Sequence, residues 1–461
     1  MSILDIFLKI EDDIKLCHYT FVYKNILMYP FIRNTLLQNA LENMQNVSSF
    51  SSPSHAGIIK KINYWIKSFL YKPSKYIKSD IIFFGSDIAN IPLEKGYFNR
   101  LTEVFANEYP AKTILIEKPD QLEYKRPRTY SRVFARDFLV IIAGIKRKIK
   151  REKTKDLEQI CSFLEYLKQH FHLDNNTWDN LKNTLFNFAR LLPFLYQEYE
   201  KIIKCISPKI IFIEDACYGG DKIPLMIAAK NLGIPVGEYQ HGMLSLAHTA
   251  YNYSPQLPEI YKFYMPDFFM SWGKYWSQNS RMPINVFDIG NPYLSNSISQ
   301  KKHIQKKEQI LYISSTIDPE KYVEEVIWLN TNLCNKGYSI IFRIHPSETS
   351  RLQTVYKRIT DNCIPIDSQP LYKSLETTKY LIGDFSTVIF EATMFDCIVF
   401  IRDTLFNRGN IDVSIFNLFY SKEDFIEKIT SMNYKKTDPD IFFTGNWREK
   451  YHKLIDSYIN N

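Results

Sequence analysis

The chain has 461 residues, of which 45% are hydrophobic and 23% are charged, and its formal net charge is +8. This composition excludes a generally disordered chain, and the length exceeds what one hydrophobic core usually organises, so we expect two domains. The seven cysteines are scattered without a CxxC pair, which excludes a disulfide framework and a cysteine-based zinc site and fits a reducing cytoplasm.

Two features of the sequence bear on membranes. Asp5, Lys9 and Glu11 interrupt the apolar N-terminal residues before a signal-peptide core could form. The longest apolar run, 138–145, is too short to cross a bilayer. The sequence therefore predicts a cytoplasmic protein that is soluble or peripheral at the inner face of the plasma membrane.

The positive charge is concentrated in two stretches. Residues 60–78 interleave Lys with Tyr, Trp and Phe (KKINYWIKSFLYKPSKYIK), and residues 146–155 read KRKIKREKTK. Basic residues mixed with aromatic ones suit an anionic membrane surface, although they also contact nucleic-acid phosphates or simply form a solvated helix face. No nucleic-acid-binding module accompanies the charge, so we favour an anionic inner-membrane surface as the partner and no nucleic acid.

In chain order, residues 1–78 form a predicted helical segment, because Leu, Ile and Phe recur at three- and four-residue spacing. Residues 79–296 are a predicted Rossmann-like domain with a helical insertion. Its predicted strands are 81–84, 113–116, 209–213, 235–239, 268–272 and 286–289. Strands that alternate with helices predict a parallel sheet covered by helices on both faces.

A polar and basic connector, 297–308, marks the predicted domain boundary. A second series of strands and helices fills 309–440, with predicted strands at 309–313, 338–344, 364–366, 380–382 and 398–401. Residues 441–461 contain a predicted C-terminal helix that packs back on the first domain. The predicted fold class is α/β, with two Rossmann-like domains facing a cleft and an N-terminal helical extension.

Polar residues cluster where the strands of the second domain end, and ligands of open parallel sheets bind at such ends. The residues are Ser314, Ser315 and Thr316, then Arg343, His345 and Pro346, and finally Ser386, Thr387 and Glu391. Ser386 and Thr387 begin a helix, where unpaired N–H groups attract anions, although Ser and Thr also simply cap helices. Glu391 shares that helix face one turn further on. The pattern predicts a nucleotide site, with phosphate at the helix start and ribose hydroxyls on Glu391.

Polar residues also follow the strands of the first domain, at Asp87, Glu214-Asp215 and 240–242. Asp87, Asp215 and His241 are candidate catalytic bases, because a carboxylate or imidazole at a strand end could take the proton of an attacking hydroxyl. Each is also common as a structural group, since loop acids cap helices and buried histidines are hydrogen-bonded. No HExxH, GxSxG, Walker or GxGxxG pattern occurs, and we predict no metal and no cofactor.

Five segments in order carry a family resemblance: AAKNLGIPVGEYQHG, PDFFMSWGKYW, IGNPYL, RIHPSE and GDFSTVIFEAT. Together they resemble bacterial GT-B glycosyltransferases of capsule, lipopolysaccharide and teichoic-acid-type loci, over roughly residues 80–420. The HP pair followed by a Ser/Thr pair resembles the sialyltransferases and Kdo transferases that use CMP-sugars. The resemblance implies that His345, Ser386 and Thr387 contact the nucleotide phosphate. Those families often hold the base in an acidic motif ending in glycine, and its nearest match here, 214–216, ends in alanine.

The resulting hypothesis is an inverting, metal-independent glycosyltransferase. The second domain would bind a nucleotide-sugar donor, with a CMP-sugar favoured, and the first would bind a surface-polysaccharide or lipid-linked acceptor. Arg343, His345 and the helix start would stabilise the departing phosphate. Three alternatives remain open: a polyol-phosphate transferase of the CDP-glycerol type, a non-catalytic scaffold of the same fold, and a UDP-sugar 2-epimerase.

Overall fold

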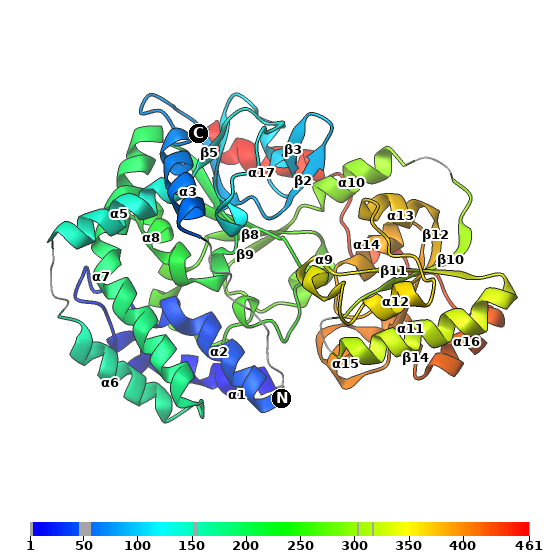
Figure 1. The fold of residues 1–461 in the computed structure, drawn as a ribbon. Coiled ribbons are helices and arrows are strands. Elements are labelled where there is room, and N and C mark those ends of the chain that lie inside the picture. Colours follow the sequence, from blue (N-terminus) through cyan, green and yellow to red (C-terminus); the bar gives the residue numbers. More distant parts are fainter. Residues whose placement is uncertain (1–2, 46–56, 151–154, 302–303, 316–317, 461) are drawn as a thin grey trace. The chain divides into compact units, whose positions relative to one another are not determined.

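The structure is a computed structural model, and it describes residues 3–45, 57–150, 155–301, 304–315 and 318–460. The chain forms two compact units (Figure 1). The first unit comprises Met1–Trp272, Ser277–Pro292 and Asn446–Asn461, and the second comprises Gly273–Trp276 and Tyr293–Gly445. Among the described residues, no helix is both long enough and apolar enough to span a membrane.

The first unit is built on a sheet of seven parallel strands in the order β5-β4-β1-β6-β7-β8-β9. The strands are β1 (Ile81–Ser86), β4 (Thr113–Lys118), β5 (Val133–Ala135), β6 (Ile210–Ile213), β7 (Val236–Tyr239), β8 (Phe268–Ser271) and β9 (Asn285–Asp288). Strands β1 and β6 are buried along their whole length, as expected for a parallel sheet covered on both faces. The chain places β4 and β5 on one side of β1 and the later strands on the other. The order reverses between β1 and β6, which is the Rossmann arrangement.

Four helices pack on this sheet or on one another; the first three are amphipathic, and the last is short and almost entirely buried. They are α5 (Asp137–Lys150), α6 (Leu157–Lys168), α7 (Asn175–Ile206) and α8 (Ile223–Asn231). Helix α7 begins where the Asp174 side chain accepts the N–H of Thr177 at 2.9 Å, and it ends at Ser207, which has a left-handed backbone with φ of 58°. Because α7 packs against α5, α6 and α8, it joins the helical layer into one core.

The remaining elements of the first unit come from distant parts of the chain. They are α1 (Ile3–Leu8), α2 (Tyr29–Gln45), α3 (Ile58–Leu70), the hairpin of β2 (Asn90–Leu93) and β3 (Gly96–Asn99), α4 (Glu103–Ala106) and α17 (Trp447–Ile459). Helix α17 packs its Tyr451 ring on Phe105, with ring centroids 4.7 Å apart. The Tyr109 hydroxyl donates to Asp456 of the same helix at 2.9 Å.

Arg33 of helix α2 forms a buried ion pair with Glu11, and the same arginine hydrogen-bonds the loop after β7. Arg33 donates to Glu11 at 2.6 Å and to the backbone oxygens of Thr249 and Asn252 at 2.7 and 2.6 Å. Glu11 also accepts the backbone N–H of Ser254 at 2.9 Å. Both charged side chains are almost completely buried, so each satisfies the charge of the other.

The second unit has a sheet of five parallel strands in the order β11-β10-β12-β13-β14. They are β10 (Lys307–Ile313), β11 (Ser339–Arg343), β12 (Thr378–Gly383), β13 (Ile398–Arg402) and β14 (Asn417–Phe419). The helices are α11 (Pro319–Leu333), α12 (Lys357–Asp361), α13 (Leu371–Thr377), α14 (Val388–Met394), α15 (Leu405–Asn410) and α16 (Lys422–Thr430). Helices α9 (Lys274–Gln278) and α10 (Pro292–Ser299) lie where the chain passes between the units.

The predicted α/β class with two Rossmann-like domains and N-terminal helices is confirmed. The strand predicted at 364–366 is wrong, because Ile366 forms only an isolated bridge with Phe342. Pro365 has no N–H to donate, so the ladder cannot extend through it.

We predict that Arg33→Met lowers the free energy of unfolding by about 3–5 kcal/mol, because it leaves the Glu11 carboxylate buried without its charge partner. Chemical denaturation followed by circular dichroism measures the loss. The matched control is Arg190→Met, which removes an exposed arginine of α7 and should change stability by less than about 0.5 kcal/mol. Equal stability of the two variants would contradict the account of the ion pair.

Candidate active site

A pocket of about 660 Å³ opens in the first unit where the strand order reverses. Ser86 is the last residue of β1, and Glu214 and Asp215 follow β6, so the pocket lies at the carboxyl ends of the two strands that flank the reversal. One wall is apolar and is formed mainly by α5, α7 and neighbouring loops, with Ile88, Leu122, Val140, Phe188, Leu191 and Leu195. The polar side is lined by Lys118, Asp120, Arg136, Asp137, Asp221 and His241.

Asp215 and His241 meet in this pocket. The Nε2 atom of His241 lies 3.1 Å from the Oδ1 atom of Asp215, and both side chains are partly exposed. Asp215 has a left-handed backbone with φ of 58°, a conformation that Asp tolerates better than most residues. Nδ1 of His241 is buried and has no hydrogen-bond partner within the described part of the chain. A carboxylate close to an imidazole is an arrangement that general bases use.

Glu214 lies beside Asp215 but in a drier environment. Burial, reinforced by the nearby charge of Asp215, raises the pKa of the Glu214 carboxyl to about 8, against a hydrogen bond from Ser86. Gly85 leaves room for it, since a Cβ there would lie 3.1 Å from Oε2 of Glu214. At neutral pH Glu214 is therefore protonated and can donate a hydrogen bond.

A second buried carboxyl, Glu238 on β7, lies behind the site. Burial raises the pKa of Glu238 to about 7, although the carboxyl accepts the backbone N–H of Cys217 and the hydroxyl of Tyr251, both at 2.8 Å. The ring of His248 lies nearby, with Nε2 3.1 Å from the Tyr218 hydroxyl. Burial and the proximity of His241 lower the pKa of His248 to about 4, so His248 is neutral at physiological pH.

Cationic groups balance the acids on the other side of the pocket. Arg136 lies 3.4 Å from Asp221, and Lys222 lies 2.9 Å from it. Although burial acts in the opposite direction, these two cations hold the pKa of Asp221 well below its usual range. Sequence reasoning missed Arg136 and Asp221, because neither lies directly after a strand predicted from an apolar run.

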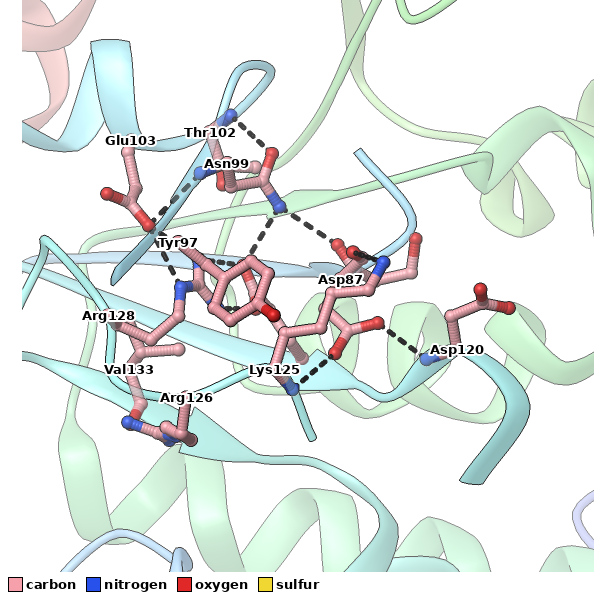
Figure 2. A network of polar contacts seen from close by, with 12 residues as sticks. Asp87, Tyr97, Asn99, Thr102, Glu103, Asp120, Lys125, Arg126, Arg128 and Val133 are labelled. Carbon is pink, nitrogen blue, oxygen red and sulfur yellow. Dashed lines mark hydrogen bonds and ion pairs between the residues drawn. The ribbon is translucent and has the colours of Figure 1, made fainter. Parts of the chain in front are cut away.

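Asp87 does not line the pocket but holds a loop that does. Its carboxylate accepts the backbone N–H groups of Asp120 and Lys125, at 2.5 and 3.2 Å (Figure 2). Burial raises the pKa of Asp87, against these two hydrogen bonds. Because both carboxylate oxygens are engaged by the loop, the geometry gives Asp87 a positioning role and leaves Asp215 and His241 as the candidate bases.

Figure 2 also shows the network that surrounds Asp87. Arg128 bridges two buried acids, Glu103 at 2.5 Å and Glu117, and Asn99 donates to Glu117 at 3.0 Å. Burial raises the pKa of Glu117, while Arg128 opposes that shift. This network joins the hairpin strand β3 to β4 and to the segment before β5.

In the second unit, the structure brings together the ends of β10 and β11. The Ser314 hydroxyl accepts the backbone N–H of His345 at 2.8 Å and donates to buried Glu348 at 2.6 Å. Glu348 also accepts from Tyr356 at 2.6 Å and from Arg351 at 2.9 Å. The His345 side chain is exposed at this edge.

The other predicted donor-site residues are more dispersed. Arg343 turns to Asp367, 2.6 Å away, at the edge strand β11. Pro346 begins a short 3-10 helix, and Thr316 lies outside the described residues. Ser315 is half-buried at the end of β10, where it hydrogen-bonds the Tyr322 hydroxyl.

The helix start predicted as a phosphate site is present at α14. The Ser386 hydroxyl accepts the N–H of Val388 at 3.3 Å, which is a capping contact, whereas Thr387 at the N-cap position makes no such bond through its side chain. Glu391 is buried, and its Oε2 atom has no hydrogen-bond partner among the residues that the structure describes. A buried carboxylate oxygen without a partner is costly, so a ligand hydroxyl there would be stabilising.

The loop that carries Ser386 is held by a buried arginine. Arg402, at the end of β13, donates to Asp384 at 2.9 Å and to Glu325 at 2.6 Å, and it also donates to the Tyr312 hydroxyl. Asn407 donates to the other oxygen of Asp384 at 3.0 Å. Sequence reasoning did not single out Arg402. An arginine at the end of an apolar strand could have drawn attention to it, but its partners are 18 and 77 residues away in the sequence.

Within the described ranges, no group of three or more His, Cys, Asp or Glu residues is arranged to hold a metal ion.

No protein-family model and no curated protein matches this sequence. Among solved structures, the UDP-GlcNAc 2-epimerase of Methanocaldococcus jannaschii in complex with UDP-GlcNAc and UDP is similar, with a TM-score of 0.44 and 13% identity over 82% of this chain and 99% of its own. The S. aureus MnaA–UDP structure has a TM-score of 0.45 and 11% identity, with coverages of 83% and 97%. A UDP-forming α,α-trehalose-phosphate synthase from Burkholderia vietnamiensis has a TM-score of 0.40 and 10% identity, with coverages of 83% and 97%. Because these TM-scores are below 0.5, the fold assignment rests on the sheet topology alone.

We predict that Glu214→Gln changes how stability depends on pH. In the wild type the unfolded chain releases the Glu214 proton above about pH 4.5, whereas the folded protein keeps it to about pH 8, so stability falls across this window. The variant has no such proton, and its stability relative to the wild type should rise with pH by up to about 1.4 kcal/mol per pH unit. Urea unfolding at several pH values between 5 and 8 measures the difference. If the unfolding free energies of the variant and the wild type changed with pH in the same way, Glu214 would not be a buried, protonated carboxyl.

Proposed function

We propose that the protein is a glycosyltransferase that moves a sugar from a nucleotide-activated donor to a hydroxyl of a surface-polysaccharide or lipid-linked acceptor. The observation that carries the proposal is the contact between Asp215 and His241 in a pocket at the strand reversal of the first unit. The motif resemblance favours a CMP-sugar as donor. In this proposal Glu214 is the hydrogen-bond donor, Asp215 and His241 together form the base, and no metal is required.

The second unit is the proposed donor site. A five-stranded Rossmann-like sheet offers Ser314, His345 and the start of α14 at strand ends, which suits a nucleotide phosphate. The unpartnered Glu391 Oε2 atom suits the ribose hydroxyls, since a carboxylate accepts two hydrogen bonds from a diol. Arg402 holds the loop before α14 in place through its ion pair with Asp384.

In the proposed reaction the acceptor hydroxyl oxygen attacks the anomeric carbon of the donor sugar. The new C–O bond forms as the bond to the nucleotide phosphate breaks, and the phosphate leaves with the electron pair. The pair of Asp215 and His241 takes the hydroxyl proton. Protonated Glu214 donates a hydrogen bond to a sugar or acceptor oxygen. A single displacement of this kind inverts the anomeric configuration.

The apolar wall of the pocket indicates which kind of acceptor would bind there. Phe188, Leu191 and Leu195 recur at three- and four-residue spacing on α7, so they present one apolar face to the pocket. The flat faces of sugar rings pack on such surfaces, and so does the first part of a lipid chain. A free, fully hydrated ion would be a poor occupant of this wall.

The experiment that tests the proposal begins with a thermal-shift screen of CMP, CDP, UDP, GDP and ADP, because a ligand that binds only the folded protein raises its melting temperature. Activated sugars of the nucleotide that binds are then incubated with lipid and glycan acceptors. Acceptor-dependent release of nucleotide with formation of a glycoside supports the proposal. Transfer from CDP-glycerol would identify a polyol-phosphate transferase, and an epimerised sugar released without acceptor would identify an epimerase. No shift with any nucleotide would indicate a scaffold.

We predict that Glu391→Gln removes discrimination for the ribose hydroxyls. Hydrogen bonds to a buried carboxylate are worth about 1.5–3 kcal/mol, so the wild type should bind its nucleotide about 10–100-fold more tightly than the 2′,3′-dideoxy analogue. In the variant the two affinities should converge. Calorimetric titration measures both, and Glu427→Gln, on the exposed surface of α16, is the control that should keep the wild-type ratio. An undiminished ratio in Glu391→Gln would refute the ribose assignment.

A further inference from the structure

Helix α3 packs against the first unit with its polar side. The Tyr64 hydroxyl donates to Asp137 at 2.6 Å, and the Ser68 hydroxyl lies 2.9 Å from the hydroxyl of Tyr124. Ser68 is fully buried. The helix therefore lies beside α5 and is fixed by these hydrogen bonds together with Phe69, which packs on the core (Figure 1).

The apolar side of α3 faces solvent. Six large apolar side chains are between 50% and 85% exposed: Ile58, Ile59, Ile62, Trp65, Ile66 and Leu70. At 100° per residue they occupy one continuous face of the helix, opposite Tyr64 and Ser68. A surface helix ordinarily turns such a face toward the core. The reversed orientation leaves a contiguous apolar surface that monomeric soluble proteins rarely expose, and such surfaces mark interaction sites.

The segment that contains this face carries only positive charge. Residues 57–79 contain six lysines and no Asp or Glu. The lysines are Lys60, Lys61, Lys67, Lys72, Lys75 and Lys78. The last turns of the neighbouring helix α5 add Arg147, Lys148 and Lys150, together with the exposed Ile149. An apolar stripe bordered by cations, with a Trp in it, complements the anionic headgroups and the acyl boundary of a lipid bilayer.

Other occupants fit this surface less well. A second copy docked on the same face would bring one set of lysines against another, and like charges across an interface are repulsive. Nucleic-acid phosphates would neutralise the lysines but would leave the isoleucines in water. Only a partner that is both anionic and apolar covers the whole surface.

We propose that α3 docks the protein flat on an anionic lipid bilayer. Its six apolar side chains enter the boundary between headgroups and acyl chains, and the lysines around them contact lipid phosphates. This docking does not depend on the reaction assigned to the protein, and it concerns only the first unit.

Vesicle flotation tests the proposal, with phosphatidylcholine vesicles that either contain or lack phosphatidylglycerol. The wild type should bind the anionic vesicles at least about tenfold more strongly, and high salt should reduce the binding. Ile62→Glu/Ile66→Glu should lose at least about tenfold in binding without a change in melting temperature, because both side chains are exposed. Leu405→Glu is the matched control, since it places the same charge at a 91% exposed apolar residue of the second unit. It should bind like the wild type.

Trp65 provides a second readout that is independent of flotation. It is the one large aromatic residue of the exposed face, and brominated phospholipids in the anionic vesicles should quench its fluorescence. Trp65→Phe should retain binding but lose that quenching. The proposal is overturned if wild type and Ile62→Glu/Ile66→Glu bind anionic vesicles equally. It is also overturned if the wild type ignores vesicles, or if the double variant converts a dimer into a monomer in light scattering without lipid.

Discussion

The proposed chemistry depends on two adjacent carboxyl groups that differ in solvation. Glu214 and Asp215 follow the same buried strand, yet Glu214 lies inside the sheet edge and holds its proton, whereas Asp215 reaches His241 in the pocket. The backbone of Asp215 is left-handed, with φ of 58°. In the proposed reaction these two neighbours have different roles, one as a hydrogen-bond donor and the other beside the imidazole that would take a proton.

Buried ion pairs hold these groups in place from a distance. Arg33 and Glu11 fasten the N-terminal helices to the loop that follows His241, and Arg128 joins Glu103 to Glu117 beside Asp87. In the second unit Arg402 does the same for the loop before α14. Buried pairs of this kind are costly to break, so they fix geometry more than they add net stability. In each unit, buried arginines therefore hold the loops at the carboxyl ends of the strands, and the proposed reaction assigns them no contact with a substrate.

Apolar runs and the polar residues that end them predicted both sheets and the edge at which ligands would bind, because the carboxyl ends of parallel strands share one side of a sheet. Individual side chains were less predictable. Arg343 was expected in the donor site, but it turns to Asp367, a partner 24 residues away that no local pattern reveals. Helix periodicity predicted a helical segment that includes α3, but the period is the same whichever face of the helix turns inward. The reversed packing of α3 follows from tertiary hydrogen bonds to Asp137 and Tyr124.

The central claim is that the two units divide the work, with nucleotide binding in the second and proton transfer in the first. The most direct measurement compares His345→Ala with His241→Gln, using the Kd for the bound nucleotide and the turnover number at saturating donor. His345→Ala should weaken nucleotide binding about tenfold or more, and His241→Gln should keep the wild-type Kd while turnover falls about 10²–10⁴-fold. Wild-type nucleotide affinity in His345→Ala, or undiminished turnover in His241→Gln, would contradict the division.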